Sequence, residues 1–247
     1  MSRYAPSSSS IGYSFGPGPI TFAVKWIIII NVAVFVLTST VAPAASDYLG
    51  LIPARVIEYG WIWQFVTYMF LHGGAMHILF NMLGIWMFGV ELERRWGTPF
   101  FVKYYAVSGI GGGLTFLLIS LLPFDAMARM YITATVGASG ALFGLLLAFA
   151  IYYPERPVLL IVVYVPARIF VMIFGGFALL NTFQPSRGVA DAAHLGGMIF
   201  GYLYLQGGPG GLTAEIKYRY LKWKMNRLRR KFDVYAGGRS DSKGRIH

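Results

Sequence analysis

Residues 136–153 read VGASGALFGLLLAFAIYY, a run without a single charged side chain that ends at Pro154. A helix needs about 20 mostly apolar residues to cross a bilayer, so this run is typical of a membrane span. The whole chain has the same character, with 56% hydrophobic and 13% charged residues over 247 positions. A soluble fold of this composition would expose large apolar patches. The sequence therefore predicts a membrane protein that crosses the bilayer several times.

Apolar runs on either side of this stretch predict an all-α membrane protein, a bundle of six transmembrane helices. The expected spans are residues 20–42, 73–90, 99–122, 136–153, a run that starts after Pro166, and 190–206. A single helix over 157–183 would place Pro166 and Arg168 near the bilayer centre, where an arginine is costly. We therefore expect a β-like stretch over 158–165 at the membrane surface, followed by the fifth span.

The positive charges orient the chain and mark its tail. With the N-terminus in the cytoplasm, eighteen of the 21 Lys and Arg lie on the inner side, as the positive-inside rule requires. Basic and aromatic residues alternate after residue 216. Such a pattern also occurs in nucleic-acid-binding segments, but beside a membrane exit it favours anionic lipid headgroups, and no nucleic-acid partner is expected. We expect a disordered cytoplasmic N-terminus over 1–19, a six-span core over 20–206 and a basic cytoplasmic tail over 207–247.

The sequence contains no cysteine, which excludes disulfides, thiolate metal sites and cysteine nucleophiles. His72 and His77 are candidate metal ligands, but on a helix two residues five positions apart point about 140° from each other. The expected spans offer no carboxylate that would complete a metal site. We therefore expect neither a metal nor a cofactor.

Polar side chains inside the expected spans are costly in lipid and need an explanation. Four stand out: His77, Asn81, Ser139 and His194. In the orientation above, the three helices that carry them all descend from the outer face, and each polar residue lies in the first turns of its helix. The four side chains are therefore expected at one depth, just below the outer surface.

Each of these residues alone has a simpler interpretation. Ser139 lies in a run of small residues that is typical of close helix packing, and His194 precedes Gly197 in a similar pattern. Together they predict chemistry, because closely packed glycine faces would bring the His194 imidazole within hydrogen-bond reach of the Ser139 hydroxyl. His77 and Asn81 share one helix face and offer donors to a developing oxyanion. The Ser139 amide, at a helix N-terminus, offers a third donor.

These motifs resemble the rhomboid family of intramembrane serine proteases. The segment GASG at 137–140 is similar to the family's Gly-x-Ser-Gly, and residues 72–81 are similar to its His-x4-His-x3-Asn at the start of the second span. Residues 193–197 (AHLGG) resemble the signature of the last span, and 93–95 (ERR) resemble a Glu-x-Arg ion-pair element on the cytoplasmic side. The resemblance extends over 20–206, with the four motifs in the family's order.

The resemblance implies a dyad of Ser139 and His194 without a third acid. It implies an oxyanion hole made by His77, Asn81 and the Ser139 amide. Supporting roles fall to Gly137, Gly140, Phe143, Gly197 and His72. Two positions depart from the pattern of bacterial members: Phe143 replaces a tyrosine that packs on the histidine, and Gln64 replaces the arginine of a Trp-Arg pair.

The resemblance also implies where the enzyme acts and on what. The substrates would be single-pass transmembrane proteins, cut near the end of their membrane helix. The enzyme would lie in a bacterial plasma (inner) membrane with its active site toward the outer face. Residues 44–72 would form a membrane-embedded first loop beside the site.

Two other functions compete with the protease. A catalytically silent rhomboid-like module would bind transmembrane helices without cutting them. A small transporter would use His77 and His194 as a proton relay, but the sequence lacks the midplane charges and broken helices that such proteins carry.

Overall fold

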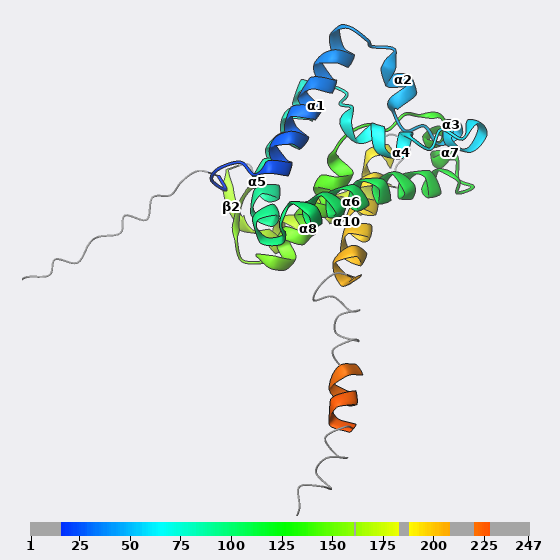
Figure 1. Cartoon of the computed structure of the whole chain (residues 1–247). Helices are drawn as coiled ribbons and strands as arrows, with labels where there is room; N and C mark the ends of the chain where they lie inside the picture. The colour runs from blue at the N-terminus through cyan, green and yellow to red at the C-terminus, as the bar shows by residue number, and fades with distance from the viewer. Residues whose placement is uncertain (1–15, 161, 183–187, 208–219, 228–247) are drawn as a thin grey trace, which may run out of the picture. The chain divides into compact units, whose positions relative to one another are not determined.

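The computed structural model describes residues 16–160, 162–182, 188–207 and 220–227. Helices make up nearly all of it (Figure 1). The six longest are α1 (Phe22–Thr40), α5 (Ala75–Trp96), α6 (Thr98–Ser120), α8 (Ser139–Tyr152), α9 (Ala167–Thr182) and α10 (Gly188–Gly207). Each overlaps one of the six expected spans, and the prediction of a helical membrane bundle is confirmed.

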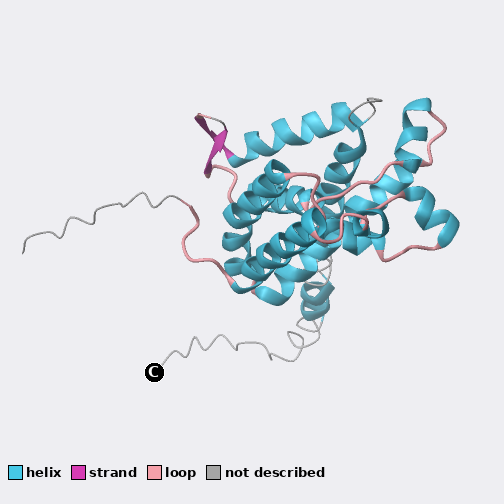
Figure 2. Cartoon of the chain, turned by 90° about the horizontal axis from the view of Figure 1, so that it is seen from above, coloured by secondary structure: helices cyan, strands magenta, loops and turns pink. Residues whose placement is uncertain are grey.

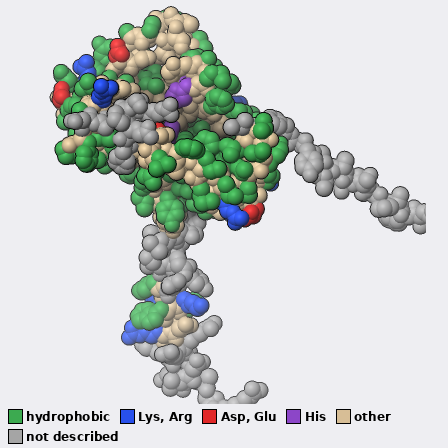
Figure 3. Space-filling model, turned by 180° about the vertical axis from the view of Figure 1, so that it is seen from behind, with side chains coloured by type: hydrophobic (Ala, Val, Ile, Leu, Met, Phe, Trp, Pro, Cys, Tyr) green, Lys and Arg blue, Asp and Glu red, His purple; other side chains and the backbone are tan. Residues whose placement is uncertain are grey.

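The helices differ in length, and this matters for membrane crossing. Among the described residues, α1, α5 and α6 have 19, 22 and 23 residues and are long and apolar enough to cross a bilayer. By contrast, α8 and α9 have only 14 and 16 residues. Large hydrophobic side chains cover much of the surface (Figure 3). On α1, for example, Val36 and Leu37 are about half exposed. Such a surface is stable in lipid and not in water.

Shorter helices occupy the connections. Between α1 and α5 lie α2 (Ala45–Leu49), α3 (Pro53–Tyr59), α4 (Gln64–Thr67) and η1 (Tyr68–Phe70), and between α6 and α8 lies α7 (Asp125–Ile132). A two-stranded hairpin precedes α9: β1 (Pro157–Leu160) pairs antiparallel with β2 (Val163–Pro166) (Figure 2). The expected β-like stretch is therefore confirmed. Arg168, in the first turn of α9, pairs with Glu155 at 2.6 Å and keeps half of its side chain exposed.

Glycines allow α6, α8 and α10 to approach one another closely. A Cβ atom at Gly112 of α6 would lie 3.4 Å from the Cα of Gly140 in α8. A Cβ atom at Gly197 of α10 would overlap with the carbonyl oxygen of Gly140. The hydroxyl of Tyr104 in α6 donates a hydrogen bond to the Gly144 carbonyl at 2.7 Å. The close approach that the glycine pattern of α8 and α10 predicts is therefore confirmed, and α6 completes the group.

Glu93 near the end of α5 holds the start of α1. Glu93 is 3% exposed, and its carboxylate accepts the backbone N–H groups of Ala23 and Val24 at 2.9 and 3.0 Å. It also accepts the hydroxyls of Thr21 and Thr98. A carboxylate at a helix N-terminus satisfies free N–H groups and the positive end of the helix dipole. In the segment that resembles the Glu-x-Arg element, Glu93 thus caps α1, and among the described residues it forms no ion pair with Arg94 or Arg95.

Two predicted segments are only partly described. Of the predicted N-terminal segment 1–19, residues 1–15 lie outside the described residues. A Cβ atom at Gly16 would overlap with the Trp86 ring, and Arg94 donates a hydrogen bond to the carbonyl oxygen of Pro17 at 2.5 Å. Within the predicted tail, a helix covers 220–227, where Arg227 lies 5.5 Å from the centroid of the Trp223 ring. That helix belongs to a unit separate from the bundle.

Candidate active site

Ser139 is the first residue of α8, and the chain before it is held from outside the helix. The Gly137 N–H donates to the Tyr68 carbonyl at 2.9 Å. Thr135 exchanges two backbone hydrogen bonds with Leu51, at 2.9 and 3.0 Å. Gly137 has a φ of 130°, a conformation that favours glycine. Its missing side chain also leaves room for the His77 ring, since a Cβ atom there would lie 2.8 Å from His77 Nε2.

His194 of α10 faces Ser139. Its Nε2 atom lies 2.8 Å from the Ser139 Oγ, the distance of a good hydrogen bond between a hydroxyl and an imidazole. The Phe143 ring, one turn further along α8, stacks on the His194 ring with 4.1 Å between centroids and 1° between planes. The imidazole is thus held by a hydrogen bond at one edge and by an aromatic ring against one face. Phe143 supplies this stacking without a hydroxyl.

Asp191 is the acidic residue next to His194. Its Oδ1 atom lies 3.5 Å from His194 Nδ1, longer than the range of a good N–H···O hydrogen bond. The Nδ1 atom is buried and has no hydrogen-bond partner among the described residues. The arrangement is therefore a pair of Ser139 and His194 with a carboxylate nearby but not engaged.

His77 lies beside Ser139, and its hydrogen bonding indicates which nitrogen carries the proton. The Gly73 N–H donates to His77 Nδ1 at 3.3 Å. A neutral imidazole that accepts at Nδ1 carries its proton on Nε2, and Nε2 is the atom next to Gly137. His77 therefore presents an N–H donor toward the Ser139 end of α8. The Ser139 N–H is a second donor there, because the first amides of a helix have no partner within it.

Asn81 lies one turn further along α5 than His77. Its side chain is 4% exposed, and its amide nitrogen donates to the His77 carbonyl at 2.8 Å. The Oδ1 atom is buried without a hydrogen-bond partner among the described residues. The structure thus places Asn81 on the same helix face as His77 but records its hydrogen bond within α5, not with Ser139.

His72 lies in the loop before α5, against the site. Its ring meets the His77 ring edge-on, with 5.0 Å between centroids. Burial and the neighbouring His77 lower the pKa of His72 to about 4, so the ring is neutral at pH 7. Among the described residues no group of three or more His, Asp or Glu could hold a metal ion.

The sequence did not identify Tyr68 and Leu51 as important for the site. Tyr68 is 1% exposed, and besides accepting from Gly137 it donates its hydroxyl to the Gly109 carbonyl of α6 at 2.6 Å. Leu51 pairs with Thr135 through backbone atoms only. A tyrosine in an aromatic loop and a leucine in an apolar chain carry no signal of such pairing, because their partners are tens of residues away.

Comparison with known proteins supports one family. A family model described as the Rhomboid domain matches residues 59–207. The chain is 28% identical over 215 residues to rhomboid protease AarA of Providencia stuartii, covering 79% of this chain and 74% of the relative.

Other relatives match over smaller shares of their length. Rhomboid protease GlpG of Yersinia pestis is 28% identical over 75% of this chain and 61% of its own length. RHOMBOID-like protein 5 of Arabidopsis thaliana is 38% identical over 40% of this chain, and the match spans 29% of the plant protein. The family model covers the glycine-packed helices and all four of the polar residues described above. The chain belongs to the rhomboid family.

Proposed function

We propose that this protein is an intramembrane serine endopeptidase that hydrolyses peptide bonds in or near the transmembrane segments of single-pass membrane proteins. The observation that carries the proposal is the 2.8 Å hydrogen bond between Ser139 Oγ and His194 Nε2. A serine hydroxyl becomes a useful nucleophile only when a neighbouring base can take its proton.

The positions of these groups support the following reaction. Ser139 Oγ attacks the scissile carbonyl carbon while its proton moves to His194 Nε2. The carbonyl oxygen becomes an oxyanion, which the Nε2–H of His77 and the Ser139 N–H stabilise. When the C–N bond breaks, the leaving nitrogen takes the proton from His194, and an ester remains on Ser139. Water then attacks the ester carbon while His194 accepts a proton from it. The bond between that carbon and Ser139 Oγ breaks, the new carboxylic acid leaves, and His194 returns the proton to Ser139 Oγ.

In this proposal Asn81 acts with His77. Its side chain belongs to the same face of α5, and a rotation about its side-chain bonds would free the amide nitrogen from the His77 carbonyl. Hydrogen bonds of an active site tighten when the substrate arrives. We assign Asn81 as a third oxyanion donor in the substrate complex.

The length of α8 supports a site inside the membrane. A helix of 14 residues is about 21 Å long, whereas the hydrocarbon core is about 30 Å thick. With the Tyr152 end at the inner surface, Ser139 would lie about 10 Å below the outer surface. We propose a bacterial plasma (inner) membrane, six spans, both termini in the cytoplasm, and a site that opens toward the outer face. The basic tail would rest on anionic headgroups.

Reconstitution in liposomes with a single-pass reporter tests the proposal. The reporter carries small residues at its outer membrane boundary. We expect cleavage by the wild type, and a loss of at least about a thousandfold in Ser139→Ala and His194→Ala, because each removes half of the nucleophile–base pair. Ser120→Ala is the matched control, since this buried serine of α6 donates its hydroxyl to the Leu117 carbonyl in its own helix. A Ser139→Ala variant that cleaves at the wild-type rate would overturn the proposal.

A fluorophosphonate probe separates an inactive protein from an unsuitable reporter. The probe reacts with activated serines whatever the substrate preference. We expect labelling of the wild type and of Ser120→Ala, and none of Ser139→Ala. A folded wild type that neither cleaves several reporters nor reacts with the probe would favour the silent helix-binding module.

A further inference from the structure

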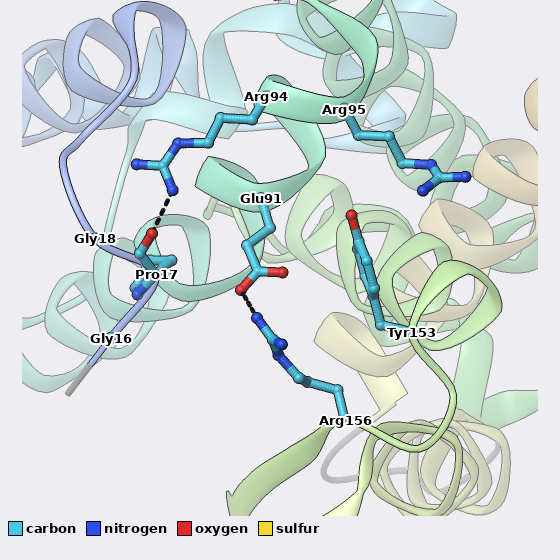
Figure 4. Close-up of a pocket in the computed structure, with 8 residues that line it drawn as sticks. All are labelled: Gly16, Pro17, Gly18, Glu91, Arg94, Arg95, Tyr153 and Arg156. Atoms are coloured by element: carbon cyan, nitrogen blue, oxygen red, sulfur yellow. Dashed lines mark hydrogen bonds and ion pairs between the residues drawn. The ribbon is translucent and has the colours of Figure 1, made fainter. Parts of the chain in front are cut away.

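A second candidate site lies far from Ser139, around a cavity of about 560 Å³. Figure 4 shows its lining at the C-terminal ends of α5 and α8. Arg94 and Arg95 come from the last turn of α5, and Tyr153 and Arg156 follow α8. Glu91 and residues 16–18 complete the lining. Three arginines and a single glutamate therefore line one cavity, with the Arg94 side chain directed toward Pro17 and the Arg95 side chain directed to the opposite side, past Tyr153 (Figure 4).

The charges of this cavity are not balanced by the contacts around it. Glu91 forms an ion pair with Arg156. Arg94 donates to backbone carbonyl oxygens of residues 17 and 19, and Arg95 lies 4.3 Å from the centroid of the Tyr152 ring. Carbonyl oxygens and aromatic rings hold a guanidinium in place without neutralising it. Arg94 and Arg95 thus leave two positive charges at the cavity, with no carboxylate pairing to them among the described residues.

The donor geometry suits a phosphate. A guanidinium carries five N–H donors, and two of them can bind two oxygens of one phosphate together. Arg94 gives two bonds to carbonyl oxygens, which leaves further donors on the same group. The contacts of Arg95 are to ring faces, so its N–H donors are not used by those contacts.

The depth of the cavity indicates the source of the phosphate. Helix α5 has 22 residues and a length of about 33 Å, which matches a hydrocarbon core of about 30 Å. His77 lies near one end of α5, so Arg94 and Arg95 lie near the opposite membrane surface. Trp96 and Tyr152, whose rings are 5.7 Å apart, are of the types that concentrate at headgroup level. Lipid phosphates lie at this level.

We propose that this cavity binds the phosphate of an anionic phospholipid headgroup in the cytoplasmic leaflet. The site belongs to the helical core and is separate from the basic tail. Lipid binding at this site requires no proteolytic activity, so this proposal can hold or fail independently of the proposed function. A purely structural role is the alternative, since arginines at the C-terminal ends of helices also offset the helix dipole. That role predicts no ligand.

Native mass spectrometry of the full chain in detergent tests the proposal. The added ligands are phosphatidylglycerol, phosphatidylcholine or inorganic phosphate. We expect phosphatidylglycerol to bind at least about tenfold more tightly than phosphatidylcholine, because only the former keeps a net negative charge. A tenfold molar excess of inorganic phosphate should not displace it. Equal binding of the two lipids would overturn the proposal, and displacement by inorganic phosphate would assign the cavity to a soluble anion.

Arg95→Gln is the variant of choice, because it removes a cavity charge and leaves the hydrogen bonds of Arg94 and the ion pair of Arg156 in place. We expect about tenfold weaker binding of phosphatidylglycerol. Arg168→Gln is the matched control: it removes an exposed charge at the start of α9, outside the cavity, and should bind like the wild type. Equal losses of phosphatidylglycerol affinity in both variants would mean that binding depends on the general surface charge and not on the cavity, and would overturn the proposal.

Thermal unfolding and gel filtration verify that each variant is folded. If Arg95→Gln does not fold, Arg95→Lys replaces it. Lysine keeps the charge but lacks the planar fork that binds two oxygens at once. We expect a loss of binding in that variant too, and an unchanged affinity would count against the proposal.

Discussion

At the residue scale, the position of His194 depends on three neighbours of different kinds. Ser139 Oγ contacts one ring nitrogen at 2.8 Å, and the Phe143 ring covers one face. Asp191 lies on the far side, 3.5 Å from the other nitrogen. Stacking fixes the plane of the imidazole, and the hydrogen bond fixes its rotation within that plane. A charged third member is not needed to orient the ring.

This arrangement predicts a small effect of Asp191→Asn. In a serine protease triad, replacing the aspartate lowers kcat about ten-thousandfold. Here the carboxylate does not form a short hydrogen bond, so we expect kcat/KM to fall by less than about tenfold, measured on the reporter in liposomes. A loss of a thousandfold or more would instead make Asp191 a positioning residue for His194.

The depressed pKa of His72 predicts a loss of stability in acid. The unfolded chain takes up a proton at this residue near pH 6.5, whereas the folded protein does so only near pH 4. Between these values the unfolded state binds more protons, so the free energy of unfolding decreases as the pH falls from 6.5 to 4. The thermal midpoint should therefore drop between pH 7 and pH 5. The thermal midpoint of His72→Phe should drop less over the same pH range. Equal drops in the wild type and in the variant would contradict the lowered pKa of His72.

At the element scale, the site depends on how closely α8 and α10 approach. Gly140 and Gly197 allow the two backbones to touch, because a Cβ atom at Gly197 would overlap with the Gly140 carbonyl. The first loop fixes the other end of the arrangement. Its Gln64 is fully buried, accepts the Ile52 N–H at 3.1 Å and donates to the Tyr48 carbonyl at 3.2 Å. Gln64 thus anchors the loop whose Tyr68 holds Gly137.

The close contact between α8 and α10 predicts that one added methyl group at Gly197 lowers both stability and cleavage. Gly197→Ala would push α10 away from α8 and lengthen the distance between Ser139 and His194. Overpacking of a tight contact costs about 1–3 kcal/mol, and a displacement of about 1 Å can cost a hundredfold in rate. We expect a lower thermal midpoint together with a loss of cleavage of a hundredfold or more.

Gly176→Ala in α9 is the matched control for this experiment. A Cβ atom at Gly176 would meet nothing within 4 Å. Alanine is also the better helix former, so stability should be unchanged or slightly higher. Wild-type cleavage by Gly197→Ala would show that close packing of α8 and α10 is not required.

At the scale of the whole molecule, the apolar surface and the distribution of arginines both fit a protein that lies in a membrane with its arginines at one membrane surface. Large hydrophobic side chains cover the outside of the bundle (Figure 3). Arg94, Arg95 and Arg156 gather at one end of α5 and α8, and Ser139 lies at the opposite end of α8. On the basis of the positive-inside rule, we propose that the arginine end faces the cytoplasm. The candidate active site would then open toward the outer face.

The absence of cysteine allows a direct test of this orientation. Ala44→Cys places a thiol at an exposed position of the first loop, and Ser242→Cys places one in the tail. A maleimide that does not cross membranes should label Ala44→Cys in intact cells after removal of any outer envelope. It should label Ser242→Cys only after lysis. The reverse pattern would invert the proposed topology.

The sequence by itself determined the helical membrane fold, the β-like stretch before α9 and the glycine contact between α8 and α10. These features follow from local properties: runs of apolar residues, prolines that end helices, and small residues at helical spacing. The four polar side chains were identifiable for the same reason, since each is an exception in an apolar span.

Only the tertiary structure decided which atoms meet. The hydrogen bonds of Tyr68 and Gln64, the capping of α1 by Glu93 and the cavity around Arg94 and Arg95 all join segments distant in sequence. The resemblance implied an ion-pair element at 93–95, but the buried Glu93 carboxylate binds the nearest free donors, and folding brought the N-terminus of α1 to it. Periodicity indicates which face of a helix is buried, whereas the partner on that face depends on how the whole chain folds.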